Sequence, residues 1–470
     1  MRACFVLLTI ATVWAADWPS FRGENGFGVA DGKPLPAEIG PQKNVVWAIP
    51  LPRGTSSAVI AGDQLYITGT ENKRLNTYAI DRSTGTIRWK REIEQPRAER
   101  LHKLNSPASA TPVTDGKSLF VFFGDFGLVS YGPDGNERWR LPLGPFSNLH
   151  GMGASPILAG DRVILVCDQD VGSYMVAVHK DTGKILWRVD RPAVVHGFAT
   201  PTLFQPAGRK IQVVVPGSYL LTSYDAETGK EVWSVRGLSW QIKNTAITDG
   251  DTIYVTGWAP GADAGESKPL PPFEVAVKDI DANGDRKLSA EEVNPSQYKH
   301  PGSWRAVDLD DDGFWSEREW GFYRARRAAR NVTMAVRPGA ARGDLTDTHV
   351  LWRNDRFVPQ VSSPLLYKGV LYTIKDGGIL TSMDPKTGVI HKTARVAGAI
   401  DAYYSSPVAG DGKLYLASEK GVVSVIKPGA QWELVSVVDF EENIYATLAL
   451  VDGRIYLRTA SRLYCLANRE

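Results

Sequence analysis

The sequence predicts an all-β chain folded as an eight-bladed β-propeller of four-stranded antiparallel blades. Three observations support this: a repeated turn motif, a repeated set of inner strands, and a spare strand near the N-terminus that closes the ring. The turn motif reads Asp-x-x-Thr-Gly, with Trp four residues after the Gly. Complete copies lie at residues 81–89 and 225–233, and partial copies at residues 135–139, 182–187 and 384–388. A repeat of about 40 to 50 residues with several strands is typical of a propeller.

The residues of the turn motif have separate physical roles. Thr84-Gly85 lies between two segments of alternating hydrophobicity, and Gly supplies the positive φ that a tight hairpin needs. Trp89 then falls on the outer strand, where its ring can bury between neighbouring blades while its indole N–H finds a carbonyl. The motif therefore predicts that a tryptophan holds each blade to the next.

Short inner-strand segments give the number of blades. All but the fourth lead through a polar turn into a hydrophobic second strand. These segments are residues 56–58, 110–112, 154–156, 199–201, 245–247, 362–364, 405–407 and 446–448. The eighth unit ends at residues 463–466 without an outer strand. We expect the segment Asn44 to Ile49, around Trp47, to supply that strand and close the ring.

The repeat resembles the pyrroloquinoline quinone (PQQ) repeat, which is shared by quinoprotein alcohol dehydrogenases and by the BamB-type propellers of outer-membrane barrel assembly. The opening Asp17-Trp18-Pro19-Ser20-Phe21-Arg22-Gly23 resembles the Trp-Pro-x-Phe-Arg-Gly start of many secreted bacterial PQQ-like propeller proteins. Together these resemblances cover nearly the whole mature chain. They are specific for the fold but leave the function open, because both enzymes and scaffolds carry the repeat.

Composition and the N-terminus limit the classes of function. The chain has 54 basic and 52 acidic residues and no basic run, so nucleic acid is not an expected partner. Residues 1–16 combine a positive start, an apolar core and a small-residue cleavage site, which predicts a signal peptide and a periplasmic or secreted protein. No other stretch approaches the roughly 20 apolar residues of a membrane span, although peripheral association with a membrane remains compatible with the sequence. We expect a monomer.

An insertion interrupts the fifth blade. The last two strands of this blade are expected at residues 332–336 and 348–353, far beyond its first two strands within residues 245–257. The predicted division of the chain is a signal peptide (1–16), an N-terminal segment (17–43), the closing strand with blades one to five in part (44–258), the insertion (259–331), and the rest of blade five with blades six to eight (332–470). Cys167 and Cys465 lie in blades that are not neighbours, so no disulfide is expected.

The insertion contains a segment that matches the twelve-residue EF-hand calcium loop, from Asp308 to Glu319. Four Asp within five residues would repel one another without a cation. Ser316 stands where a water is usually held, and Gly313 provides the sharp turn. The other expected ligands are the carboxylates of Asp308, Asp310 and Asp312, the carbonyl of Phe314 and the bidentate carboxylate of Glu319.

A second such loop lies upstream, from Asp281 to Glu292. Its expected ligands are the side chains of Asp281, Asn283, Asp285 and Glu292 and the carbonyl of Lys287. Arg286 stands at the turn position, where a non-Gly residue at positive φ costs about 1 kcal/mol. The alternative register from Asp279 puts Ala290 at the twelfth position and is rejected.

The two loops together predict two bound Ca²⁺ ions. Leu288 and Trp315 should face each other in the short β-pair that joins such loops. The segment between the loops contains Pro295, Pro301 and Gly302 and is too short and broken for long sensor helices, so a structural role for Ca²⁺ is expected. The following helix, residues 317–330, carries five arginines, which we expect to form a solvated face rather than a binding patch.

The inner ends of the blades predict a polar and aromatic mouth to the axial channel. His150 and His196 occupy near-equivalent places in adjacent blades, each before a Gly. Such a ring of side chains would suit a small ligand or a metal, although repeated His-Gly is equally compatible with turn chemistry. The candidate ligand-binding residues are His150, His196, Gln360, Asp401, Tyr403 and Tyr404, with Asn105, Lys243 and Asn443 nearby.

The resemblance to quinoprotein dehydrogenases implies PQQ, a disulfide ring of adjacent cysteines, a Glu-Asn-Asp set for Ca²⁺ and a catalytic Asp. This chain has no adjacent cysteines, and Asp401 is the one acidic residue that could be placed at the mouth. PQQ is therefore not expected. We predict a non-catalytic binding or scaffold protein whose protein or glycan partner is unknown. The alternative is a PQQ-dependent alcohol or sugar dehydrogenase with its site at the propeller mouth.

Overall fold

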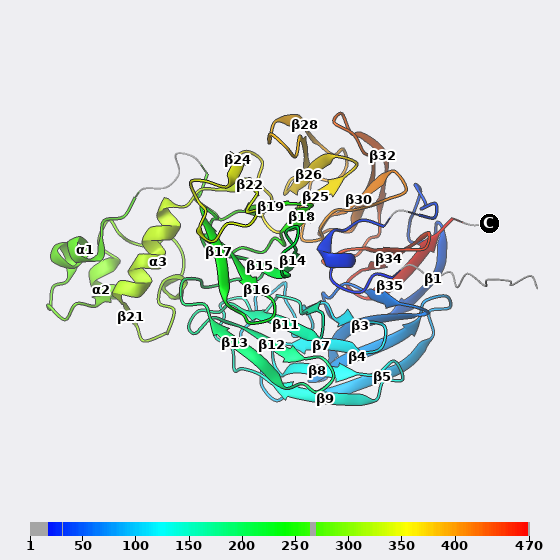
Figure 1. Cartoon of the computed structure of the whole chain (residues 1–470), viewed down its shortest axis with the longest axis horizontal. Helices are drawn as coiled ribbons and strands as arrows, with labels where there is room; N and C mark the ends of the chain where they lie inside the picture. Colours follow the sequence, from blue (N-terminus) through cyan, green and yellow to red (C-terminus); the bar gives the residue numbers. More distant parts are fainter. Residues whose placement is uncertain (1–16, 31, 264–268, 469–470) are drawn as a thin grey trace, which may run out of the picture.

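The computed structural model describes residues 17–30, 32–263 and 269–468 and shows eight antiparallel sheets arranged as a ring, with a small helical insert at the rim (Figure 1). The predicted fold class is confirmed. The predicted signal peptide lies outside the described residues. Within the described ranges, no helix is long and apolar enough to cross a membrane.

Blades one to four follow one another along the chain, each with its four strands in sequence order. Blade four gains a fifth short strand, which comes from the connection between the last two strands of blade five and pairs parallel with the outer strand of blade four. The strands are β2 (Val59–Ala61), β3 (Gln64–Glu71), β4 (Arg74–Asp81) and β5 (Ile87–Glu94); β6 (Val113–Thr114), β7 (Leu119–Phe123), β8 (Gly127–Tyr131) and β9 (Glu137–Pro142); β10 (Ile157–Ala159), β11 (Arg162–Cys167), β12 (Tyr174–His179) and β13 (Ile185–Asp190); and β14 (Thr202–Phe204), β15 (Gln212–Gly217), β16 (Leu220–Asp225), β17 (Glu231–Arg236) and β23 (Gly343–Asp344).

Blades five to eight include the interrupted blade and the closing blade. Their strands are β18 (Ile247–Asp249), β19 (Thr252–Gly257), β22 (Val332–Val336) and β24 (Val350–Asn354); β25 (Leu365–Tyr367), β26 (Val370–Lys375), β27 (Ile379–Met383) and β28 (Ile390–Arg395); β29 (Val408–Gly410), β30 (Lys413–Ala417), β31 (Val422–Lys427) and β32 (Glu433–Asp439); and β33 (Ala449–Val451), β34 (Arg454–Arg458), β35 (Arg462–Ala467) and β1 (Val45–Pro50). Between β19 and β22 lie α1 (Phe273–Ile280), β20 (Leu288–Ser289), α2 (Ala290–Val293), η2 (Trp304–Ala306), β21 (Phe314–Trp315) and α3 (Glu317–Ala328).

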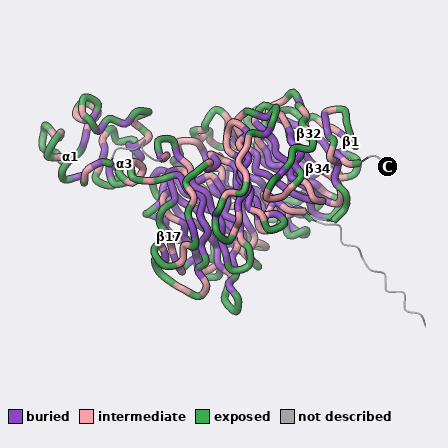
Figure 2. The backbone as a smooth tube through the Cα atoms, turned by 90° about the horizontal axis from the view of Figure 1, so that it is seen from above, coloured by how far each residue is buried: buried purple, intermediate pink, exposed green. Residues whose placement is uncertain are grey.

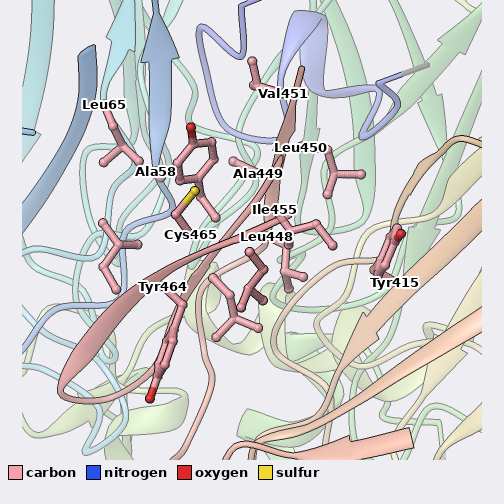
Figure 3. Packing of buried hydrophobic residues seen from close by; sticks show 14 of the residues in the cluster. Ala58, Leu65, Tyr415, Leu448, Ala449, Leu450, Val451, Ile455, Tyr464 and Cys465 are labelled. Carbon is pink, nitrogen blue, oxygen red and sulfur yellow. The ribbon is translucent and has the colours of Figure 1, made fainter. Parts of the chain in front are cut away.

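The ring is closed by pairing the N-terminal strand with the last strand of the chain, as predicted. Strand β1 lies antiparallel to β35, with Trp47 opposite Cys465. Figure 3 shows the packing at this junction, where Cys465 lies among buried residues of blades one, seven and eight. Buried residues run through the blades, whereas the insert extends beyond the disc (Figure 2). Cys167 and Cys465 are both buried and unbonded.

Five outer-strand tryptophans each pack against the turn glycine of the following blade. A Cβ on any of these glycines would stand 2.5–2.8 Å from the indole ring, and their φ values of 69–79° also favour Gly. The indole N–H donates to a carbonyl in the same turn, at 2.7–3.3 Å. The pairs are Trp47 with Gly85, Trp89 with Gly135, Trp139 with Gly183, Trp187 with Gly229, and Trp352 with Gly388. Trp233, which belongs to a complete copy of the motif, instead donates its indole N–H to Gln212 Oε1 of its own blade at 2.9 Å.

The predicted inner-strand segments lie directly before the inner strands, except in blade five, where β18 begins at Ile247 within the segment. Each segment places one buried Ser or Thr beside the axis, and we call these eight residues the axial hydroxyl ring. In seven of the eight junctions the backbone N–H of one member donates to the hydroxyl oxygen of the next, at 2.9–3.0 Å. The members are Ser57, Thr111, Ser155, Thr200, Thr245, Ser363, Ser406 and Thr447.

The junction between Thr200 and Thr245 lacks this bond, and the buried Thr245 hydroxyl has no hydrogen-bond partner among the described residues. The N-terminal segment crosses the axis at this place, near η1 (Glu24–Gly26), which is drawn in dark blue in Figure 1. Asn25 donates to the Leu203 carbonyl and accepts from the Leu203 N–H. The segment that begins Trp-Pro-x-Phe-Arg-Gly therefore covers one end of the channel, and Trp18 within it is buried.

We predict that Gly85→Ala lowers the free energy of unfolding more than Gly62→Ala. Both glycines have positive φ, but Gly62 has open space around its missing Cβ, whereas Gly85 meets the Trp47 ring at 2.8 Å. Strain at positive φ costs about 1 kcal/mol at both sites, and overpacking adds about 1–3 kcal/mol at Gly85 only. Urea unfolding of the two variants measures the difference. Equal losses would show that the tryptophan does not hold the turn.

We predict that Thr111→Val costs about 1–3 kcal/mol, whereas Thr245→Val is neutral or stabilising. The first change leaves the buried Ser57 N–H without its acceptor, and the second removes a hydroxyl that is already unpaired. The substitutions are matched in shape, so their urea midpoints compare the hydrogen bonds directly. A loss at Thr245 as large as that at Thr111 would contradict the interpretation of the ring.

Candidate functional site: a mouth pocket beside two acidic loops

A pocket of about 470 Å³ occupies the end of the axis opposite the N-terminal segment. Members of the axial hydroxyl ring and Phe21 contribute to its lining, and Phe21 also lines a smaller cavity of about 240 Å³ beneath it. The walls come from connections that precede inner strands and from connections that follow second strands. These connections share one face of a propeller, so we call this site the mouth pocket.

The mouth pocket contains three of the six predicted ligand-binding residues: His150, Gln360 and Tyr404. Asn105 and Lys243 also line it. The other three predicted residues lie outside the lining. His196 is completely buried with its Nδ1 2.6 Å from Asp170 Oδ1, Tyr403 is buried with its hydroxyl donating to the Ala399 carbonyl, and Asp401 accepts from the Ser418 hydroxyl.

Two lining residues, Asp376 and Trp258, were not identified from the sequence. Each follows the second strand of its blade, β26 and β19, rather than preceding an inner strand. Asp376 Oδ1 accepts the Tyr403 N–H at 2.9 Å, and burial raises the pKa of this carboxyl. Trp258 lies under the ammonium group of Lys243, 6.0 Å from nitrogen to ring centroid.

Lys243 is the cation of the mouth pocket. Its Nζ donates to the Gln241 carbonyl at 3.2 Å. Burial, and then repulsion from Arg326, lower the pKa of Lys243 to about 8. The amine is therefore mostly protonated at neutral pH, and it can pair with an anionic group of a ligand.

His150 is a neutral imidazole at neutral pH, because burial and neighbouring positive groups lower its pKa to about 4. Its Nε2 lies 3.4 Å from Gln241 Nε2, and its ring meets that of His102 edge-on. Asn105 donates to the His150 carbonyl at 2.7 Å. Amide, imidazole, ammonium, carboxylate and aromatic groups thus converge on one cavity, a composition suited to a small polar ligand.

In the insert, the second acidic loop (Asp308–Glu319) gathers carboxylates around a common point. Oxygens of Asp308, Asp310 and Asp312 all lie within 4.8 Å of one another. The Gly313 N–H donates to Asp308 Oδ2, and Glu319 closes the loop by accepting from the Leu309 and Ser316 N–H groups. Asp308 is only 4% exposed, and its Oδ1 has no hydrogen-bond partner among the described residues.

The first acidic loop (Asp281–Glu292) has the same internal bonding but is more exposed. The Arg286 N–H donates to Asp281 Oδ2, and Glu292 accepts from the Ala282 and Ser289 N–H groups. Arg286 has the expected positive φ, 59°. The Arg286 side chain pairs with Glu274, while Lys287 pairs with Asp312 of the second loop.

A two-stranded sheet joins the loops, with Leu288 opposite Trp315 as predicted. Trp315 is completely buried and stacks on Trp304 at 4.4 Å between ring centroids, within a core of the insert's own residues. The arginines of α3 were expected to form a solvated face, and this expectation is only partly met. Arg324 donates to the Leu270 carbonyl and Arg326 lies over the Trp240 ring of the propeller, because their guanidinium groups have acceptors and aromatic faces within reach.

We predict that the Lys243 ammonium titrates near pH 8, below its ordinary value of 10.5. Between these pH values the folded chain holds fewer protons than the unfolded chain, so this lysine makes the free energy of unfolding rise with pH. Lys243→Met should remove roughly 2 kcal/mol of that rise between pH 7.5 and 9.5. Urea unfolding at both pH values, with NMR titration of the dimethylated amine, measures the effect. An amine that titrates at 10.5 would refute this electrostatic account.

The repeat and the fold can be compared with those of known proteins. A family model for the outer membrane protein assembly factor BamB matches residues 45–129, 78–234 and 173–263. These ranges cover the closing strand and the blades that precede the insert. Comparison with curated proteins gives no match.

Several solved structures share the fold. BamB from Moraxella catarrhalis superposes with a TM-score of 0.54 at 12% identity, over 90% of this chain and 99% of that one. A europium-containing methanol dehydrogenase gives 0.62 at 9% identity, over 96% and 98%. A quinohemoprotein alcohol dehydrogenase from Comamonas testosteroni gives 0.61 at 12% identity, over 97% and 81%. The chain is thus an eight-bladed propeller. Part of its sequence matches the BamB family model, and its fold is similar to the folds of BamB and of quinoprotein dehydrogenases.

Proposed function

We propose that the chain is a periplasmic or secreted, non-catalytic binding protein, in which a calcium-loaded EF-hand insert stands beside a ligand pocket at the propeller mouth. The observation that carries the calcium assignment is the buried, unpartnered Asp308 Oδ1 within a cluster of three carboxylates. A buried carboxylate oxygen without a donor is costly unless a cation binds it. Within each loop, backbone N–H groups donate to the carboxylates on the inside of the turn, which supports the assignment.

The register proposed for the first loop has support from the position of Asp279. This carboxylate accepts the Tyr298 hydroxyl at 2.8 Å, so it is already engaged outside the loop. Asp281 instead binds the N–H groups of Gly284 and Arg286 from the inside of the turn. The two Ca²⁺ ions would be held by the carboxylates named for each loop, with carbonyls from Lys287 and Phe314. Bound Ca²⁺ supplies charge neutralisation that stabilises the folded insert.

A binding role for the propeller is favoured by the composition of the mouth pocket. Its lining combines Lys243 and a neutral His150 with amides and aromatic rings, which can hold a polar ligand by hydrogen bonds and stacking. The partner that presents such a ligand would be a protein or a glycan. A periplasmic or secreted location is supported by the apolar N-terminal segment of the sequence.

The alternative is a PQQ-dependent dehydrogenase with its site in the same pocket. Its support is the fold shared with the dehydrogenases, together with a pocket on the axis. The donor set does not fit the calcium–quinone arrangement, because Asp376 is the sole carboxylate among the described lining residues and already accepts the Tyr403 N–H. Cys167 and Cys465 lie in separate blades, so neither supplies an adjacent-cysteine ring.

Calorimetric titration of the chelator-treated protein with Ca²⁺ tests the proposal. We expect two Ca²⁺ per chain, one site lost in Asp308→Asn and the other in Asp281→Asn, because each substitution removes a ligand charge. Asp279→Asn is the matched control and should bind as the wild type does. Loss of a site in that control would show that Asp279 is a ligand and that the first loop begins at Asp279 rather than at Asp281.

The same titration series should include PQQ with and without Ca²⁺. Absence of quinone binding, together with two calcium sites, supports the binding-protein proposal. Stoichiometric binding of PQQ would refute it and favour the dehydrogenase, with Asp376 as the first residue to substitute. A chain that binds no Ca²⁺ at either loop would overturn the calcium assignment.

A further inference from the structure

The insert stands on the same face of the propeller as the mouth pocket. It leaves and re-enters blade five between the second and third strands, β19 and β22, and Trp258 of the pocket lies directly after β19. Asn331 clamps the two ends together, since its side chain accepts the Ala259 N–H and its backbone N–H donates to the Ala262 carbonyl. The two ends of the insert are therefore held together beside the mouth pocket, and its helices extend beyond the rim (Figure 1).

The second acidic loop and α3 also pack directly on the propeller. Leu309, which lies between the proposed ligands Asp308 and Asp310, is buried in a cluster with Val195 and Trp240. The Arg326 guanidinium covers the Trp240 ring at 5.5 Å from its centroid. Tyr219 of blade four donates its hydroxyl to the Phe322 carbonyl of α3 at 2.8 Å. A residue inside the cation loop thus forms part of the interface with the propeller.

The covered tryptophan belongs to the segment that forms one wall of the mouth pocket. Gln241, the next residue, has a φ of 55°, and its amide nitrogen reaches His150 Nε2 at 3.4 Å. Its carbonyl accepts from the Lys243 ammonium at 3.2 Å. Positive φ in a non-Gly residue persists only where the surroundings hold it. The insert supplies part of that support by covering Trp240.

We propose that cation binding at the second acidic loop is coupled to the shape of the mouth pocket through the contact of Leu309 and Arg326 with Trp240. This inference rests on the calcium site proposed above. Without the cation, repulsion among Asp308, Asp310 and Asp312 loosens the loop and withdraws Leu309 from the interface. Trp240 then loses its cover, and the segment from Trp240 to Lys243, which holds the lining residue Lys243, relaxes. By linkage, a ligand that favours the ordered wall also tightens cation binding.

Backbone hydrogen exchange of the full-length mature protein, with Ca²⁺ or with chelator, tests the coupling. We expect chelation to speed exchange in residues 238–244 about fivefold or more, because partial opening of even 1 kcal/mol changes exchange by that order. Residues 400–404, the equivalent connection between blades six and seven, should not respond. The imidazole NMR signal of His150, assigned with His150→Gln, should shift between the two conditions.

Two mild substitutions interrupt the contact without touching a proposed ligand. Arg326→Met keeps the apolar stem but removes the guanidinium, and Tyr219→Phe removes one hydroxyl. We expect both variants to bind Ca²⁺ in calorimetry while the exchange response of residues 238–244 falls at least twofold. Arg324→Met is the matched control, since this arginine bonds to Leu270 within the insert, and its response should equal that of the wild type.

The outcomes separate the two proposals. A second loop that binds no Ca²⁺ overturns the calcium assignment and the coupling with it. Ca²⁺ binding without any change at residues 238–244 or at His150 overturns the coupling alone. A full response in both Arg326→Met and Tyr219→Phe overturns the route through Trp240. The expected combination is binding in all variants, with a weakened response only where the contact is interrupted.

Discussion

The axial hydroxyl ring is the interaction on which the rest of the propeller depends. The innermost strand of each blade is an edge strand, whose N–H groups need acceptors from outside the blade. In seven junctions a Ser or Thr of the next blade accepts the exposed N–H. In five blades the following residue is Pro, which carries no N–H to satisfy. The repeated Ser/Thr-Pro pair therefore deals with the unpaired N–H groups of the inner edge in two ways. The hydroxyl accepts one N–H of the neighbouring blade, and the proline has no N–H that needs an acceptor.

The same ring determines where ligands can bind. Its small side chains leave a cavity above them, and Phe21 fills the axis from below. The mouth pocket therefore has a floor made by Phe21 and by six members of the axial hydroxyl ring, and walls that differ from blade to blade. Chemistry that distinguishes this chain from another propeller lies in those walls and in the insert, because the floor serves the fold.

Much of the architecture follows from local patterns in the sequence. The turn motif, the inner segments and the spare strand around Trp47 predict the blades and their closure, because each blade repeats the same physical unit. Leu288 and Trp315 could be paired because loop spacing places them. Asp376 and Trp258 could not be predicted, since only the topology of the blade brings the ends of second strands to the mouth. His150 and His196 share a sequence context, yet only His150 lines the pocket, whereas His196 is completely buried beside Asp170.

The contacts between the insert and the propeller could not be predicted from the sequence either. Leu309 is an ordinary apolar residue at the second position of the loop, and the residues next to it in the sequence do not predict its contact with Trp240. Arg326 resembles the other arginines of α3, although it alone lies over that ring among the arginines with described contacts. Contacts between a repeat fold and its insertion depend on the relative placement of two separate cores, for which no periodic pattern exists.

Closure of the ring by β1 and β35 carries a consequence for biogenesis. The first strand of the propeller to be synthesised is the last to find its partner, since β35 lies at the far end of the chain. Until then β1 is unpaired, and so is the edge of β35 that faces away from β34. Contacts between residues so far apart in the sequence form slowly. A nascent chain therefore remains an open arc. Factors that guard unpaired strands would act on it longest at this seam.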